Sequence, residues 1–221
     1  MGYYLGNSKI NIKGLKRIYS SETGDVYKYK SDALRIFKDE KNPPLDENTA
    51  DLLMGTSTDR ILLPKNLLFY NNSFRGYTYK LISKKGSGKK ITTIPKDDLV
   101  GNILIIERDI ETLSNKQVLL NGIEPANTIF NGNLYLSDPS AYTKLDSYSV
   151  KELERLNKYQ FHLLLVSLII SELRKSSISS KTEKQVKELL YLRDENNNSS
   201  DFLTDIIDDN DSIKQFVKKI Q

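Results

Sequence analysis

The spacing of apolar residues changes along this chain, and that change limits the folds open to it. In the first third, apolar residues form short runs that alternate with polar ones, the period-two pattern of half-buried strands. Later they recur at steps of three and four, as in amphipathic helices. A chain of 221 residues with strands first and helices afterwards predicts an α+β fold.

The first part of the chain predicts a sheet with one helix. Residues 26–29 and 33–37 are joined by a short polar turn, which favours a β-hairpin. Residues 45–54 predict a helix, because Asp46 and Glu47 lie in its first turn, where acids suit the helix dipole. We expect a five-stranded antiparallel sheet in this part. Further apolar runs continue the strand pattern at residues 15–19, 61–63, 67–70 and 74–82.

Three parts are expected along the chain: a sheet in 1–83, a joint in 84–96 and a helical part in 97–221. The joint begins with a basic, glycine-containing loop. This loop departs from the phosphate-binding loop pattern, because Ser83 and Lys90 stand where glycine and a hydroxyl residue are required. A solvated linker is therefore favoured, although the positive charge would also suit an acidic partner.

The helical part is predicted to contain two long helices and one hairpin. Asp97 or Asp98 is expected to cap the first helix, and the second covers 150–170. An Asn-Gly pair at Asn131 separates two short apolar runs and is a strong hairpin signal. The first helix has an apolar face formed by Leu99, Ile103, Ile106, Ile110 and Leu113.

Composition and charge exclude several function classes. The chain has no cysteine and a single histidine, His162, which excludes thiolate zinc sites and cysteine nucleophiles and leaves little room for imidazole catalysis. The net charge of +4 comes from 33 basic and 29 acidic residues, so neither a nucleic acid nor a membrane partner is indicated. The most apolar run, 161–170, is about half the length needed to cross a bilayer. The start resembles no export signal, so a cytoplasmic location is expected.

The predicted hairpin is bracketed by two side chains that can bind a metal. Asn127 precedes the first strand and Asp138 follows the second, so the hairpin should bring them together. An amide oxygen and a carboxylate are suitable ligands for Mg²⁺. The same two residues would also suit an Asx-turn and a strand-end cap.

The order of these parts resembles the protein kinase-like fold, in particular the small bacterial kinase-like and pseudokinase proteins. The resemblance covers about residues 16–170 and implies two lobes, the second reduced and mainly helical. It implies a nucleotide site in which Gly24 is the one glycine left of a glycine-rich loop, ahead of Val26. Arg35 stands where that family has a phosphate-binding lysine, with Lys38 as an out-of-register alternative.

The resemblance also implies partners for these groups. A glutamate of the following helix should pair with the cation of the lysine position. Glu47 is the first choice for this glutamate, and Asp46 and Asp51 are alternatives. In the second half, Asn127 matches the family's metal-binding Asn and Asp138 its metal-binding Asp, which together would hold ATP and Mg²⁺.

The catalytic position is the clearest departure from the family. Counting five residues back from Asn127 puts Gly122 where the catalytic Asp belongs, and glycine cannot accept a substrate proton. The sequence therefore predicts a pseudokinase-like protein that binds nucleotide and Mg²⁺ weakly or serves as an interaction module for an unknown protein. An active atypical kinase or nucleotidyl transferase, with Glu124 as substitute base, is the alternative. The third hypothesis is a structural or toxin-associated module of another kind.

Overall fold

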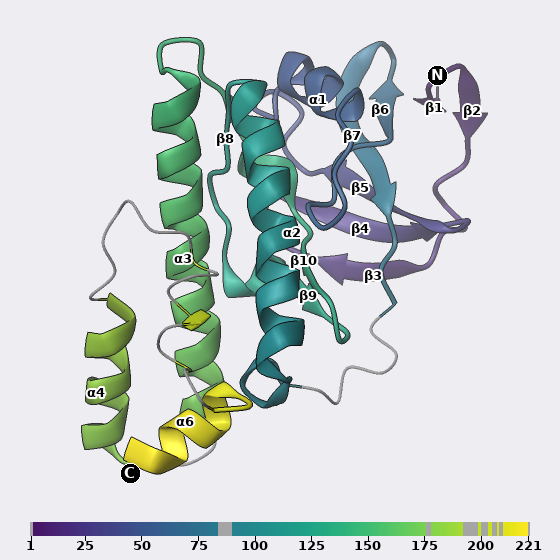
Figure 1. Cartoon of the computed structure of the whole chain (residues 1–221). Coiled ribbons are helices and arrows are strands. Elements are labelled where there is room, and N and C mark those ends of the chain that lie inside the picture. Colours follow the sequence, from purple (N-terminus) through teal and green to yellow (C-terminus); the bar gives the residue numbers. More distant parts are fainter. Residues whose placement is uncertain are drawn as a thin grey trace.

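The structure of the chain is a computed structural model that describes residues 2–83, 90–175, 178–191, 199, 203–204, 207 and 210–220. Its N-terminal part is an antiparallel sheet and its C-terminal part is helical, so the predicted α+β class is confirmed (Figure 1). Most of the predicted basic joint, residues 84–89, lies outside the described residues.

The sheet has seven strands, so the predicted number of five is wrong. Their order is β2-β1-β6-β7-β5-β4-β3, and each neighbouring pair is antiparallel. The strands are β1 (Tyr3–Leu5), β2 (Ser8–Ile10), β3 (Arg17–Ser20), β4 (Gly24–Tyr29), β5 (Asp32–Phe37), β6 (Asn66–Tyr70) and β7 (Ser73–Lys80).

One local feature accounts for the two additional strands. An N-terminal hairpin, β1–β2, turns at Gly6 with φ of 55° and adds two strands to the edge of the sheet beside β6. By contrast, the apolar run 61–63 forms no strand. Within this run only Ile61 makes a bridge, to Leu136, so the run connects the sheet to the second half of the chain.

The predicted hairpin of residues 26–29 and 33–37 is confirmed as β4–β5. Its register places Arg35 opposite Val26, and on its other side Arg35 faces Tyr77 of β7. Gly76 of β7 has φ of 152°, and a Cβ there would lie 2.0 Å from the Arg35 carbonyl oxygen. A glycine is therefore required for β7 to approach the backbone of Arg35 this closely.

One helix, α1 (Glu47–Met54), lies against β6 (Figure 1). Asp46 caps it by accepting a hydrogen bond from the Thr49 backbone N–H at 2.9 Å. Ala50 and Leu53 are buried on its inner face. The predicted helix 45–54 is confirmed, with its start two residues later.

Two long helices, α2 (Lys96–Asn115) and α3 (Val150–Lys175), pack against each other in the helical part. All five predicted apolar residues of α2 are buried. The predicted cap is wrong, because α2 follows Pro95 and both Asp97 and Asp98 lie within its first turn. None of the helices in the described ranges is long and apolar enough to span a bilayer. The remaining elements are η1 (Ile91–Thr93), β8 (Val118–Leu119), η2 (Pro125–Asn127), β9 (Thr128–Phe130), β10 (Leu134–Leu136), η3 (Pro139–Ala141), β11 (Thr143–Lys144), α4 (Ser180–Tyr191) and α6 (Ile213–Ile220).

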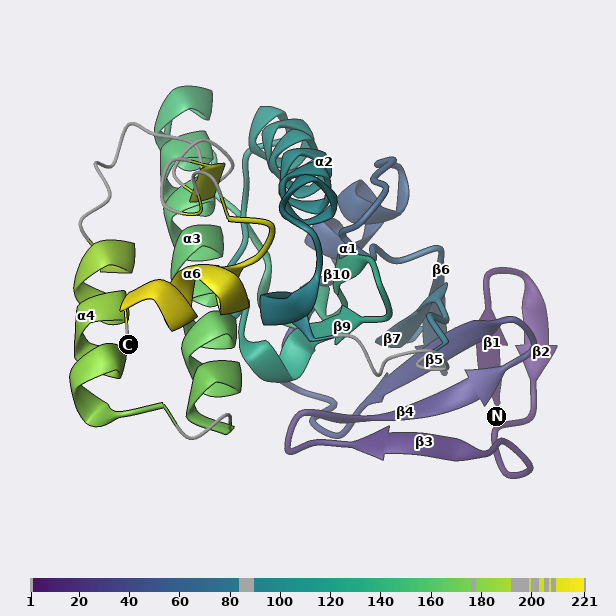
Figure 2. The same cartoon turned by 60° about the horizontal axis from the view of Figure 1, so that its bottom comes forward.

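The β9–β10 hairpin, predicted from its Asn-Gly turn, lies between the sheet and α2 (Figures 1 and 2). Buried polar side chains of the helices fix the segments around it. Asn102 of α2 accepts from the Leu134 N–H at 2.8 Å, and Asn157 of α3 accepts from the Leu120 N–H at 2.8 Å. The carboxylate of Asp109 accepts the backbone N–H groups of residues 59, 60 and 61.

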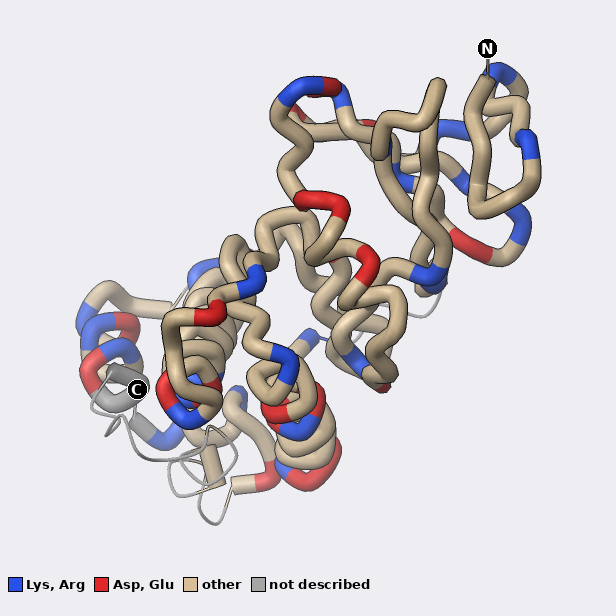
Figure 3. The backbone as a smooth tube through the Cα atoms, turned by 90° about the horizontal axis from the view of Figure 1, so that it is seen from above, with Lys and Arg blue, Asp and Glu red and all other residues tan. Residues whose placement is uncertain are grey.

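Lys and Arg residues are interspersed with Asp and Glu over both the sheet and the helices (Figure 3). This distribution agrees with the mixed charge of the sequence. His162 is buried in α3, and its Nδ1 lies 3.4 Å from the Ser199 hydroxyl. It therefore belongs to the helical core.

Candidate functional site

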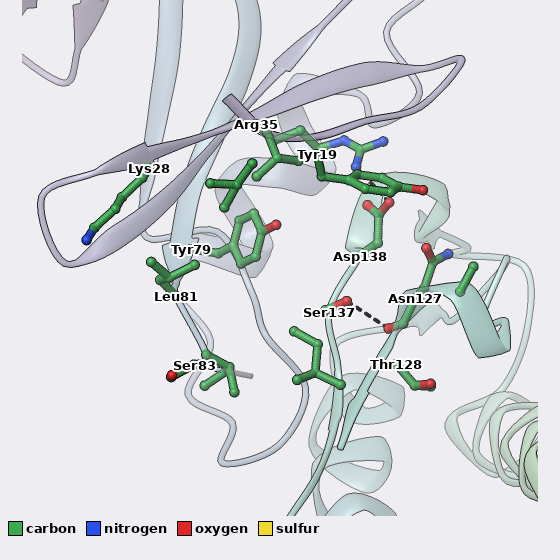
Figure 4. Close-up of a pocket in the computed structure, with 15 residues that line it drawn as sticks. Tyr19, Lys28, Arg35, Tyr79, Leu81, Ser83, Asn127, Thr128, Ser137 and Asp138 are labelled. Carbon is green, nitrogen blue, oxygen red and sulfur yellow. Dashed lines mark hydrogen bonds and ion pairs between the residues drawn. The ribbon is translucent and has the colours of Figure 1, made fainter. Parts of the chain in front are cut away.

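A cavity of about 530 Å³ lies between the sheet and the β9–β10 hairpin. Strands β3, β4 and β5 and the end of β7 form one wall, and η2, β9 and the end of β10 form the other. Figure 4 shows the side chains that line it. This volume is in the range of pockets that hold small molecules.

Arg35 and Asp138 meet inside this cavity. The Arg35 Nη1 donates to Asp138 Oδ2 at 2.8 Å, and Nη2 donates to the Thr23 hydroxyl at 2.7 Å. The Arg35 and Asp138 side chains are 3% and 14% exposed. A charge-assisted bond between two groups so well shielded from water is stronger than a surface pair. It joins the sheet to the hairpin across the cavity.

The second oxygen of Asp138 is also occupied. Its Oδ1 accepts from the Ser140 backbone N–H at 3.1 Å and from the Tyr77 hydroxyl at 3.4 Å. Burial and then the charge of Asp138 raise the pKa of Tyr77 well above its ordinary value, so Tyr77 is a neutral donor. The same two causes raise the pKa of Tyr79, on the cavity wall, to about 12.

The hairpin brings Asn127 and Asp138 to the same cavity, as the sequence predicted. The Ser137 backbone N–H and hydroxyl both donate to the Asn127 carbonyl, each at 2.8 Å. The Asn127 side chain donates to the Gly122 carbonyl at 3.0 Å, which closes the loop before it.

These residues do not fit a Mg²⁺ ion. Asp138 is the one carboxylate among the described residues that line the cavity, and a guanidinium already neutralises it. A divalent cation at Asp138 would lie beside the positive charge of Arg35. In the described part of the chain, no cluster of three or more His, Cys, Asp or Glu side chains could hold a metal.

The position at which the resemblance implies a catalytic Asp is tight for a Cβ. Gly122 has φ of 66°, a left-handed conformation that residues with a Cβ adopt at a cost. A Cβ there would lie 2.9 Å from the Ala141 Cβ. The backbone of this loop is therefore adapted to glycine. Glu124, the predicted substitute base, is exposed and is absent from the described residues that line the cavity.

The prediction that Glu47 pairs with Arg35 is wrong. Glu47 is exposed at the start of α1 and lines a separate hollow with Gly6 and Asn66, so Arg35 pairs with Asp138 instead. Lys38 does not take the place of Arg35 either. Its Nζ donates to the Ser20 hydroxyl at 3.2 Å and to the Ser21 carbonyl at 2.6 Å.

The two remaining predicted nucleotide residues lie on β4. Val26 is buried and lines the cavity. Gly24 is buried beside it, and a Cβ at Gly24 would lie 2.7 Å from the Ile36 carbonyl oxygen. Gly24 therefore permits the close approach of β4 and β5 at the cavity, without lining it.

Sequence reasoning missed Thr23, Tyr77 and Tyr79. Thr23 precedes Gly24 in the β3–β4 turn, so a hydroxyl beside the predicted glycine loop was the available signal. Tyr77 and Tyr79 are two positions apart on β7 and therefore lie on the same face of the strand. Only the register of β7 against β5 shows that this face lies near Asp138.

No protein-family model and no curated protein sequence matches this chain. Solved structures do match. The Neurospora crassa PAN3 pseudokinase is similar over 97% of this chain and 66% of its own, with 16% identity and a TM-score of 0.53. This chain has a protein kinase-like fold.

A viral kinase, PK-1 of the Cydia pomonella granulovirus, matches 65% of this chain and 55% of its own, with 14% identity and a TM-score of 0.45. The chain thus spans about two thirds of the pseudokinase and just over half of the viral kinase. At these identities the likeness extends to the kinase-like fold alone.

Proposed function

We propose that this chain is a pseudokinase-like protein, which keeps a ligand cavity in a kinase-like fold and acts by binding rather than by phosphoryl transfer. The observation that carries the proposal is the Arg35–Asp138 ion pair in the cavity. In this pair Arg35 neutralises the carboxylate of Asp138, the residue that the resemblance implies would bind a metal ion.

Phosphoryl transfer depends on positioning and on neutralising the charge of the phosphates, mostly by metal ions and cations. With Arg35 bound to Asp138, the described lining of the cavity offers neither a free carboxylate for a metal nor an unpaired cation at its centre. Gly122 adds a second deficit, since no side chain at that position can accept a proton from a substrate hydroxyl.

The geometry argues against the alternative of an active enzyme with Glu124 as base. A general base must lie within hydrogen-bond reach of the proton that it removes. Glu124 is exposed at the start of η2 and is absent from the described residues that line the cavity. A binding role, toward a small molecule or a protein partner, agrees better with this arrangement.

A transfer assay tests the proposal. The purified protein is incubated with Mg²⁺ and ATP labelled at the γ- or the α-phosphate, with generic protein acceptors, and an active kinase serves as positive control. We expect no label transfer above that of the Asp138→Asn variant. Transfer by the wild type that Asp138→Asn abolishes would contradict the proposal, and its loss in Glu124→Gln would identify the base.

A further inference from the structure

We propose that Asn131 is a site of spontaneous covalent modification, at which its side-chain amide is converted to a carboxylate. The conversion releases the tip of the β9–β10 hairpin from Ser83. The reaction requires neither a ligand nor a partner protein, because Asn131 reacts with its own neighbour in the chain. The hydrogen bonds of Asn131, the free backbone of Gly132 and a comparison with Asn121 support this assignment.

An Asn that precedes a glycine can react with the backbone, because glycine has no side chain to hinder the approach. The glycine nitrogen attacks the Asn Cγ and forms a C–N bond. The side-chain nitrogen leaves as ammonia and takes the amide proton of the glycine with it. Water then opens the resulting cyclic imide at either carbonyl, which gives Asp or isoaspartate. The sequence contains two such pairs, Asn121-Gly122 and Asn131-Gly132.

The hairpin turn holds the Asn131 side chain in a reactive arrangement. Its Oδ1 accepts a hydrogen bond from the Asn133 N–H at 3.3 Å, which folds the side chain over the Gly132 peptide as in an Asx-turn. The same N–H stabilises the negative charge that develops on Oδ1 when Cγ is attacked. Asn133 is itself held in place, since its Oδ1 accepts from the Arg60 Nη2 at 3.0 Å.

The attacking nitrogen is available. Within the described residues the Gly132 N–H makes no hydrogen bond, so no such bond has to break before it reacts. Gly132 has φ of 101°, and the space that a Cβ would occupy there is open. The turn can therefore adjust as the imide ring closes.

Asn121 lacks this combination. Its Nδ2 donates to the Thr143 hydroxyl at 3.5 Å, and no described residue donates to its Oδ1. Gly122 is also confined, because a Cβ there would lie 2.9 Å from the Ala141 Cβ. The Gly122 carbonyl accepts from the Asn127 side chain at 3.0 Å. The backbone at Asn121 therefore has less freedom to close a ring, and the two pairs should react at different rates.

The conversion changes the contact between the hairpin and the end of the sheet. The Asn131 Nδ2 donates to the Ser83 carbonyl at 3.1 Å. An ionised carboxylate at this position has no proton to donate, and it faces the carbonyl oxygen of Ser83. Repulsion replaces the hydrogen bond, so the hairpin tip separates from the segment that follows β7.

Peptide mapping by mass spectrometry measures the conversion at both positions. The folded protein is incubated in mildly alkaline buffer made with isotopically labelled water, so that each hydrolysed imide incorporates labelled oxygen. We expect Asn131 to convert about tenfold or more faster than Asn121, a difference of about 1.4 kcal/mol in the barrier. In urea the two rates should become similar, because the fold causes the difference. Asn131→Gln should remove the reaction at 131 and leave that at Asn121 unchanged.

Hydrogen exchange measures the effect on the hairpin. Asn131→Asp reproduces one product of the reaction, and it should make the amides of residues 128–136 exchange about fivefold faster than in the wild type. Asn121→Asp is the matched control, since it introduces the same charge at the other Asn-Gly pair and should leave these amides unchanged.

Three results would overturn the inference. These are conversion of Asn131 in the folded protein that is no faster than that of Asn121, a rate difference that persists unchanged in urea, and unaltered exchange of the hairpin amides in Asn131→Asp. The transfer assay for the proposed function is independent of all three.

Discussion

The Arg35 guanidinium donates to the Asp138 carboxylate over 2.8 Å, between two residues 103 positions apart in the sequence. This bond crosses the cavity and joins β5 to the residue segment that follows β10. A side-chain cation thus neutralises Asp138, where the resemblance implies a metal ion.

Removing either partner should destabilise the protein. Arg35→Ala leaves a buried carboxylate without its cation, and Asp138→Ala leaves a buried guanidinium without its anion. We expect each to lower the free energy of unfolding by about 2–4 kcal/mol, and the double variant to cost less than the sum. Urea unfolding of the four proteins measures this coupling.

The Lys65–Asp32 pair is the matched control, because its N–O distance is 2.7 Å but Lys65 is 48% exposed. Its coupling should lie between about 0 and 1 kcal/mol. Equal coupling in the two pairs would show that burial adds nothing to the Arg35–Asp138 bond.

Placing an acid at residue 122, where the resemblance implies a catalytic Asp, should not create an active enzyme. Gly122→Asp places a Cβ at φ of 66° and 2.9 Å from the Ala141 Cβ, so we expect a loss of about 1–3 kcal/mol in unfolding free energy and no transfer activity. Gly6→Asp is the control, since Gly6 has a similar φ of 55° and open space around it. A gain of activity in Gly122→Asp, or equal stability losses in both, would contradict the steric account.

Asp109 should be important for stability although it faces no ligand. Asp109→Asn removes the charge of a buried carboxylate whose Oδ2 accepts the N–H groups of residues 59–61, and it places an amide donor at the Oδ1 position, opposite the Asp59 N–H. We expect the unfolding free energy to fall by about 2–3 kcal/mol. Asp59→Asn, whose side chain is 65% exposed in its pair with Arg108, should change it by less than about 0.5–1 kcal/mol. Thermal unfolding of the wild type, Asp109→Asn and Asp59→Asn measures the difference between the two substitutions.

The stability of the protein should fall in alkali partly because of Tyr79. Its folded pKa of about 12 lies above the ordinary value of 10.0. The folded state therefore keeps the proton that the unfolded chain releases, and stability is lost as the pH rises from 10 through 12. A shift of this size corresponds to roughly 2–3 kcal/mol.

Tyr79→Phe should flatten the decline of unfolding free energy over that pH window. Tyr159→Phe, at a residue that is 46% exposed, should not. The measurement is urea unfolding at several pH values. Identical slopes for the wild type and Tyr79→Phe would contradict the assignment.

Local patterns predicted much of the fold. The β4–β5 hairpin, the apolar face of α2 and the Asn-Gly hairpin depend on residues that are close in sequence, and the structure confirms all three. The β1–β2 hairpin was missed because its strands have only three residues each and their pairing with β6 is long-range. The Gly6-Asn7 pair between them was the one local turn signal.

Only some residues of the predicted site lie together, and their pairing was not predicted. Val26, Arg35, Asn127 and Asp138 line one cavity, whereas Gly24, Glu47, Gly122 and Glu124 are absent from its described lining. Arg35 binds Asp138 rather than Glu47 because of the way the sheet and the hairpin face each other. The spacing of residues along the sequence does not predict this long-range arrangement. For the same reason no local pattern indicates that the side chains of Asp109 and Asn157 fix distant loops.

The central claim is that Arg35, and not a metal ion, neutralises Asp138. Titration with Mn²⁺, followed by electron paramagnetic resonance with and without ATP, tests it most directly. The account predicts that the wild type binds no more Mn²⁺ than Asp138→Asn under either condition. Stoichiometric Mn²⁺ binding by the wild type that is lost in Asp138→Asn would contradict it.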